Sequence, residues 1–347
     1  KIKLKMALKK TVFLCLSLIF MSSALYAQDQ EPEKAESKPG HTNTNKFKQL
    51  YDEFSTPNMF RSASGTPGPD YYQQQADYKI DLILDDKNAK LSGFETITYT
   101  NNSPDELKYL WIQLDQNKRE KDSQSPLIEA SSLNPIFTPN DFTSTYLKKP
   151  LDRGFNILEV TDAKGKAIPH MINRTMMRIE LTNPLKHGEK YSFSIKWWYN
   201  INDHVIEDGR SGYEFFPKDG NRAYVIAQFF PRMAVYSDVE GWQNSQFWGR
   251  DEFALPFGDY EVNITVPADH VLDGTGVLTN RKEVYSKTMM QRYEQAKESY
   301  ETPVVIVNQD EAKAKEQGFS EKTKTWKLKA KNVRDFGFAS SRKFILD

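Results

Sequence analysis

Histidines are the side chains in this sequence that could ligate a catalytic metal ion. The five are His41, His170, His187, His204 and His270, and none is followed by the glutamate of an HExxH zinc helix. Only His204 has acidic neighbours, in the stretch NDHVIEDG, which could bind a metal ion but is read more simply as a solvated turn. The sequence also lacks a GxSxG elbow, a Walker loop and a GxGxxG loop. The residues alone therefore indicate no complete active site.

The best local candidate for a binding group is Gln228. Gln228 is expected at the end of an apolar strand, and the segment that follows is dense in aromatic residues, namely Phe229, Phe230, Tyr236, Trp242, Phe247 and Trp248. A neutral amide at a strand end, held among rigid rings, could recognise a polar ligand atom. The alternative is that Gln228 only satisfies a backbone group beside an aromatic core.

Composition and charge exclude several classes of protein. The chain has 347 residues, with 47 Lys and Arg against 47 Asp and Glu. Five lysines and no acids lie in residues 1–27, so the remainder carries 42 basic and 47 acidic residues. This near-neutral balance does not indicate binding to nucleic acid or to anionic lipid. The single cysteine, Cys15, also lies there. The mature chain therefore has no disulfide, thiolate nucleophile or cysteine metal site.

The N-terminus has the charged, apolar and small-residue order of a secretory signal. Lys9 and Lys10 precede the apolar run TVFLCLSLIFM, and Ala27 is the expected last residue removed. The run is too short for a membrane-spanning helix, although a retained anchor is the alternative. Residues 28–70 are predicted to be a disordered leader, because their first part is rich in Pro, Glu, Lys, Thr and Asn. We therefore expect an exported protein, periplasmic or extracellular.

The elements that must position Gln228 are predicted from two-residue alternation. Strands are expected at 78–84, 91–100, 107–114, 177–181, 191–197, 260–266, 326–330 and 333–339. Turn signals every 8–12 residues favour antiparallel, sandwich-type sheets, so the predicted fold is mainly β. One amphipathic helix is expected within 285–300, where Tyr285, Met289, Tyr293, Ala296 and Tyr300 recur at helical spacing. These elements are assigned to one β domain over residues 71–347.

Two segments depart from this pattern. Residues 115–153 are polar and irregular, which is typical of a functional loop or an insertion. The last residues, SSRKFILD, are apolar without a closing turn, which favours a chain that continues beyond Asp347.

At these residues the sequence resembles the N-terminal β region of the aminopeptidase N family of zinc metallopeptidases, in its exported bacterial branch. The most specific stretch is YVIAQFFPRMAVYSDVEGWQNSQFWGRDEFALPFGDYEVNITVPADHVL, at residues 224–272. Residues 76–117 and 331–341 (KNVRDFGFASS) support it. The three stretches cover about a third of the chain and keep their order.

The resemblance implies a saddle-shaped, mostly antiparallel β domain that precedes a thermolysin-like catalytic domain. In such enzymes a Gln or Glu of the β domain helps to bind the α-amino group of the substrate. The resemblance implies this role for Gln228. The spacing from Gln228 to Asp238 is shorter than in better-known members, and the Cys often found near the Phe-Pro turn is missing.

The family's HExxH helix, its second Glu and its GxMEN loop are absent from residues 1–347. The resemblance therefore implies zinc in the parent protein, with its ligands beyond Asp347, and peptides and the chain's own catalytic domain as partners. Two alternatives stay open. One is a stand-alone β-sandwich module that binds peptide or glycan on segment 229–248, and the other is a non-catalytic family member that only binds.

Overall fold

The computed structural model describes residues 57–125, 128, 138–143, 152–207, 209, 211–249 and 253–347. The predicted signal and most of the predicted leader lie outside these residues. Residues 57–70 were expected to belong to the leader, yet they form a hydrogen-bonded loop. Arg61 holds this loop, because its guanidinium binds the buried carboxylate of Asp238 at 2.7 and 3.0 Å.

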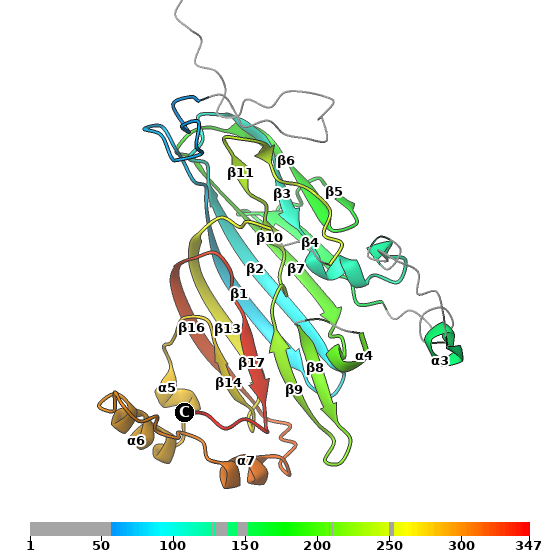
Figure 1. Ribbon diagram of the computed structural model, residues 1–347, viewed down its shortest axis with the longest axis vertical. Coiled ribbons are helices and arrows are strands. Elements are labelled where there is room, and N and C mark those ends of the chain that lie inside the picture. The colour runs from blue at the N-terminus through cyan, green and yellow to red at the C-terminus, as the bar shows by residue number, and fades with distance from the viewer. Residues whose placement is uncertain are drawn as a thin grey trace, which may run out of the picture.

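Antiparallel β-sheets dominate the architecture, which confirms the predicted fold class (Figure 1). The largest sheet crosses the length of the molecule. Its strands, in spatial order, are β15 (Val277–Leu278), β16 (Thr323–Val333), β13 (Gly258–Pro267), β1 (Gln75–Asp85), β2 (Lys90–Thr100), β7 (Lys190–Asn200) and β4 (Asn156–Asp162). The pair β1 and β13 is parallel, and the other neighbours in this sheet are antiparallel.

Two four-stranded sheets complete the core. The first has the order β10 (Arg232–Met233), β3 (Leu107–Gln113), β6 (Met176–Leu185) and β5 (His170–Asn173). The second has the order β14 (Val271–Gly274), β17 (Phe338–Ser341), β9 (Asn221–Ile226) and β8 (Gly212–Phe216). A short hairpin joins β11 (Tyr236–Ser237) to β12 (Gly241–Trp242).

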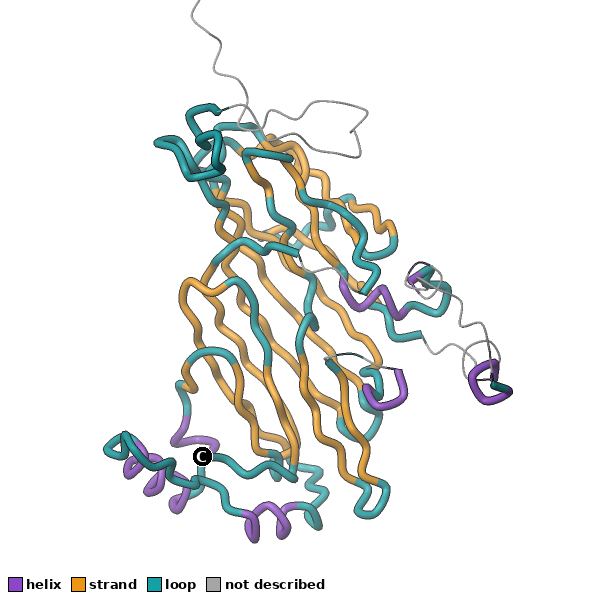
Figure 2. Tube along the Cα trace, viewed as in Figure 1, coloured by secondary structure: helices purple, strands orange, loops and turns teal. Residues whose placement is uncertain are grey.

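Helices are few and lie at the margins of the sheets (Figure 2). The described ones are η1 (Asp115–Arg119), α3 (Pro139–Phe142), α4 (His204–Glu207), α5 (Arg281–Val284), α6 (Lys287–Ala296) and α7 (Gln309–Lys315). The helix predicted within 285–300 is confirmed as α6, which Ser286 caps by accepting a hydrogen bond from the Met289 N–H. Within the described ranges, no helix is long and apolar enough to cross a membrane.

The predicted strand at 333–339 is wrong as a single element. β16 ends at Val333, residues 334–337 cross between two sheets, and β17 begins at Phe338. The chain turns because Asn332 adopts a positive φ of 50° and because Asp335 is held by Arg232. The other strands predicted by alternation are confirmed, with ends that shift by a few residues.

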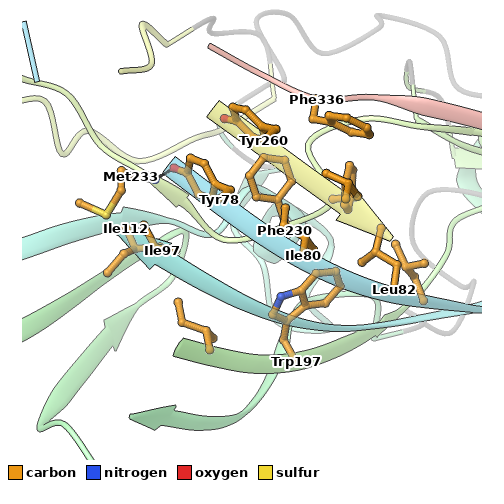
Figure 3. Close-up of a cluster of buried hydrophobic side chains, with 14 of the residues drawn as sticks. Tyr78, Ile80, Leu82, Ile97, Ile112, Trp197, Phe230, Met233, Tyr260 and Phe336 are labelled. Carbon is orange, nitrogen blue, oxygen red and sulfur yellow. Dashed lines mark hydrogen bonds between the residues drawn. The ribbon is translucent and has the colours of Figure 1, made fainter. Parts of the chain in front are cut away.

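Aromatic rings fill the space between the sheets (Figure 3). Tyr78 stacks on Tyr260 with ring centroids 4.7 Å apart, and Phe230 packs edge-on against Tyr78 at 5.3 Å. The Tyr78 hydroxyl accepts a hydrogen bond of 2.9 Å from the Met233 N–H, so the polar end of this buried ring is satisfied. The core thus ties β1 and β13 directly to β10.

The largest buried side chain depends on a glycine in the next strand. Trp197 of β7 is opposite Gly93 of β2, and its ring lies where a Cβ of residue 93 would be. Both residues face the core, where Trp197 is 1% exposed. The glycine is required here for space, since its backbone conformation is ordinary for a strand.

One carboxylic acid is enclosed in this core. Glu95 of β2 is 0% exposed and lies between Ile80 and Ile195 of the neighbouring strands, and neither of its oxygens has a hydrogen-bond partner among the described residues. Burial raises the pKa of Glu95 well above its ordinary value of 4.5, because the charged form loses its hydration. The folded protein therefore retains a proton there that the unfolded chain releases above about pH 4.5.

We expect Gly93→Ala to lower the free energy of unfolding by about 1–3 kcal/mol, since the added methyl group forces Trp197 from its position. Urea denaturation measures this change. Ser92→Ala, on the opposite face of the same strand, is the control and should change stability by less than about 0.5 kcal/mol. Equal effects of the two substitutions would contradict the packing argument.

The proton on Glu95 makes stability depend on pH. Because the folded-state pKa is raised, its contribution is fully present below the unfolded value and is lost as pH rises toward the folded value. Glu95→Gln should remove the decrease in the free energy of unfolding that Glu95 causes between pH 5 and pH 8, as measured by urea denaturation at both pH values. Glu261→Gln is the control, since the hydrogen bond from Lys329 lowers the pKa of Glu261 and its contribution to stability therefore changes little between pH 5 and pH 8. A Glu95→Gln protein with the same pH slope as the parent would refute the assignment.

Candidate functional site

Gln228 is the second residue after β9, where the chain leaves the sheet. Its φ is +51°, in the left-handed region that side chains other than glycine rarely adopt. The neighbouring groups hold this turn from both sides: the Ala227 N–H donates to Ser211 Oγ at 3.0 Å, and the Gln228 carbonyl accepts from Gln116 Nε2 at 2.9 Å. The structure therefore fixes the backbone of the residue that the sequence singled out.

The two rings that follow Gln228 anchor the turn. Phe229 and Phe230 are both 0% exposed. Phe229 contacts the rings of Phe336 and Phe338, and Phe230 contacts those of Tyr78 and Tyr260 (Figure 3). Phe229 and Phe230 fill the core, whereas the side chain of Gln228 is only half-buried.

The backbone and the side chain of Gln228 differ in their contacts. Its backbone carbonyl is bonded to Gln116, but its side chain makes no hydrogen bond to any residue that the structure describes. The alternative from the sequence, that this amide satisfies a backbone group, therefore finds no support among the described residues. An amide offers one acceptor oxygen and two N–H donors.

Arg232 connects the turn to two distant segments. Its guanidinium binds Asp115 through two nitrogens, at 3.1 and 2.9 Å, and Asp335 through the third, at 2.8 Å. Burial lowers the pKa of Arg232, but the charges of Asp115 and Asp335 outweigh this effect and leave it above its ordinary value. Burial also raises the pKa of Asp335, against the opposing charge of Arg232. These ion pairs join the segment that follows Gln228 to Asp115 and to Asp335.

Sequence reasoning missed the partners of this arginine. Asp115 and Gln116 belong to η1, at the start of the segment read as an irregular loop, and both are buried. The signal was available, because an arginine within the apolar run FFPRMAV must find carboxylates when it is buried. The sequence does not indicate which of its many carboxylates pair with Arg232.

A cavity of about 390 Å³ opens at the other end of η1. Its charged lining includes Glu120, Asp122 and Arg174, with the indole of Trp248 beside them. Burial raises the pKa of Glu120 to about 7, and the neighbouring charges of Asp122 and Asp152 add to the shift. The charge of this cavity therefore changes near neutral pH.

The predicted aromatic segment 229–248 does not present its rings together. Four of them are buried, namely Phe229, Phe230, Tyr236 and Phe247. Trp242 and Trp248 are half-buried and lie beside different cavities. The segment therefore serves mainly as core, and among its described rings Tyr236, Trp242 and Trp248 border a cavity.

The histidines of the described residues lie apart. His170 and His187 each contact a backbone carbonyl, while His204 begins α4. In the parts of the chain with assigned positions, no group of three His, Cys, Asp or Glu side chains could hold a metal ion. The described residues therefore do not fit a zinc ion, and Asp208 of the turn around His204 lies outside them.

One histidine does sit beside a serine and an aspartate. His270 Nδ1 lies 2.9 Å from Ser340 Oγ, and its Nε2 lies 3.8 Å from Asp86 Oδ2. His270 and Ser340 are both 0% exposed, and Asp86 is bound at 2.6 Å by Arg342. A substrate cannot reach this serine, so the cluster joins β17 to the β1–β2 turn and is structural.

Comparisons with known proteins give a weak structural likeness. No protein-family model and no curated protein matches the sequence. An M1 zinc metallopeptidase from Deinococcus radiodurans has a TM-score of 0.40 and 12% identity over 79% of this chain and 43% of its own. A mutant of that enzyme bound to the substrate Tyr-Ser-Ala has a TM-score of 0.39 and 12% identity, over 77% and 42%. The chain thus spans less than half the length of these structures.

We expect Arg232→Ala to lower the free energy of unfolding by about 3–5 kcal/mol, because it leaves the carboxylate of Asp115 buried without its partner. Chemical denaturation measures this loss. Lys329→Ala, which breaks an exposed ion pair with Glu261, is the control and should cost less than about 1 kcal/mol. Comparable losses in the two variants would show that the Arg232 network is not a structural centre.

Proposed function

We propose that this chain is the β domain of a zinc-dependent aminopeptidase, where it walls the substrate cleft and helps to bind the free amino terminus of a peptide. One observation carries the proposal. The three stretches that resemble the aminopeptidase N family meet in a single network, since Arg232 of residues 224–272 binds Asp115 of residues 76–117 and Asp335 of residues 331–341. This convergence supports the view that the resembling residues serve one common site.

In this proposal Gln228 is the recognition group. Its amide oxygen accepts a hydrogen bond from the ammonium group of the substrate, and its own backbone is held by Gln116, Ser211 through Ala227, and two buried rings. A hydrogen bond to a charged group contributes about 1.5–3 kcal/mol. Because the backbone of Gln228 is already held, binding has to order only its side chain.

Zinc belongs to the proposed parent protein and is assigned to residues outside this chain. The described residues do not fit a zinc ion. What this chain contributes is substrate binding and the wall of a cleft. Export through an N-terminal signal, to the periplasm or the outside of the cell, is part of the same proposal.

The test uses the full-length gene product. Reading the gene in frame past Asp347 should reveal a GxMEN loop and an HExxH motif with a distal Glu, and the purified protein should contain zinc and release amino acids from unblocked peptides. Absence of the motif together with absence of zinc would refute the enzyme. A protein that has the HExxH motif but neither binds zinc nor cleaves peptides would instead be a non-catalytic member of the family.

For Gln228→Ala in that protein, we expect kcat/KM for a free-amino peptide to fall by an amount equivalent to about 1–3 kcal/mol. Gln243→Ala is the matched control, because Gln243 is another half-buried glutamine of residues 224–272 and, among the described residues, only its backbone is hydrogen-bonded. It should leave kcat/KM unchanged. An unaltered kcat/KM for Gln228→Ala would mean that Gln228 is only structural.

A further inference from the structure

A second cavity, of about 310 Å³, lies far from Gln228, between the start of β3 and the β11–β12 hairpin at the end of the molecule opposite α6 and α7 (Figure 1). Four aromatic side chains line it: Tyr109, Trp111, Tyr236 and Trp242. Its volume is at the lower end of the range for small-ligand pockets. Lys108 at this end of β3 and Asp115 after its other end are roughly 20 Å apart at the rise of a strand.

The rings of this cavity are held in place by the core. Tyr236 packs edge-on against Trp242 with centroids 5.2 Å apart, and Trp242 stacks on the buried Tyr99 at 6.1 Å. The Tyr236 hydroxyl donates to Asp105 Oδ2 at 2.6 Å. The hairpin that carries Tyr236 and Trp242 is itself paired in register, Tyr236 opposite Trp242. The rings of Tyr236 and Trp242 are therefore held in position before any ligand arrives.

Hydrogen-bonding groups of both kinds surround the rings. The indole N–H groups of Trp111 and Trp242 donate to no residue in the part of the chain that the structure describes, and neither is sealed in the core. At the rim, Glu106 contributes acceptors, Lys108 contributes donors and Asn244 contributes both, and all three are exposed. None of these three has a hydrogen bond or ion pair to a described residue.

This mixture decides the class of ligand. An organic cation requires acceptors and open ring faces, but Lys108 is at the rim and Arg178 already covers the Tyr109 ring at 3.9 Å. An anion requires donors, but Glu106 and Glu240 also line the cavity. A sugar has hydroxyl groups that donate and accept, together with an apolar C–H face that packs on an aromatic ring. Rigid rings with mixed donors and acceptors match those two properties.

We propose that this cavity binds a saccharide, with a pyranose ring packed against Trp111 and Trp242 and its hydroxyl groups bonded to the indole N–H groups and to Glu106, Lys108 and Asn244. The site is independent of peptide binding at Gln228, because it lies at the other end of β3. It gives the chain a second binding surface, one that holds the protein on a glycan while leaving the cleft open.

The experiment titrates the full chain with cellobiose, maltose, lactose and N,N′-diacetylchitobiose, followed by tryptophan fluorescence and by calorimetry. We expect at least one of them to bind saturably, and Trp111→Ala and Trp242→Ala each to weaken that binding at least about tenfold. Trp198→Ala is the matched control. Trp198 is also half-buried but lies on the large sheet beneath Lys90, so this variant should bind as the parent does.

Folding is checked separately, because a tryptophan substitution can disturb the core. Asn244→Ala alters only an exposed side chain and should weaken binding several-fold at an unchanged melting temperature. The proposal is overturned if none of the four disaccharides binds, if they bind equally to the parent and the cavity variants, or if tetramethylammonium or a tripeptide occupies the cavity in their place. Peptide cleavage by the full-length Trp111→Ala protein should be unaltered, which separates this site from the proposed peptidase function.

Discussion

The ion-pair network of Arg232 is the interaction on which the rest of the arrangement depends. A buried guanidinium costs several kilocalories per mole in lost hydration, and only well-placed carboxylates offset this cost. The guanidinium of Arg232 donates two hydrogen bonds to Asp115 and a third to Asp335. The end of β3, the turn after β9 and the crossing from β16 to β17 must all be in position before this part of the core is stable.

The network explains how a strained residue can persist next to it. A left-handed conformation costs a non-glycine residue about 1–2 kcal/mol, and Gln228 adopts one at a φ of +51°. The rings of Phe229 and Phe230 are fully buried immediately after it, and Arg232 is fixed two residues further on. Strain of this kind persists only where the surroundings over-determine the conformation, and here two buried rings and the bound Arg232 do so.

Strand β3 links the two proposed binding regions because its two faces differ. Leu110 and Ile112 face the core and are fully buried. Tyr109 and Trp111 are half-buried on the other face and line the cavity at the start of the strand. Past its end, η1 brings Asp115 to Arg232 and Gln116 to Gln228. One strand therefore runs from the cavity to the segment that contacts Arg232 and Gln228.

The sequence by itself determined the elements and the candidate amide, because alternation of side chains and helical spacing are local properties of the chain. β1, β2, β3, β7, β13 and α6 follow directly from it, and the capping pattern Asn308 to Glu311 would have indicated α7 as well. Tertiary structure alone decided which carboxylates meet Arg232, since Asp115 and Asp335 lie 117 and 103 residues away. It also divided the predicted strand at 333–339 and brought Trp111 to Trp242. Such pairings depend on how sheets pack, and no local pattern encodes them.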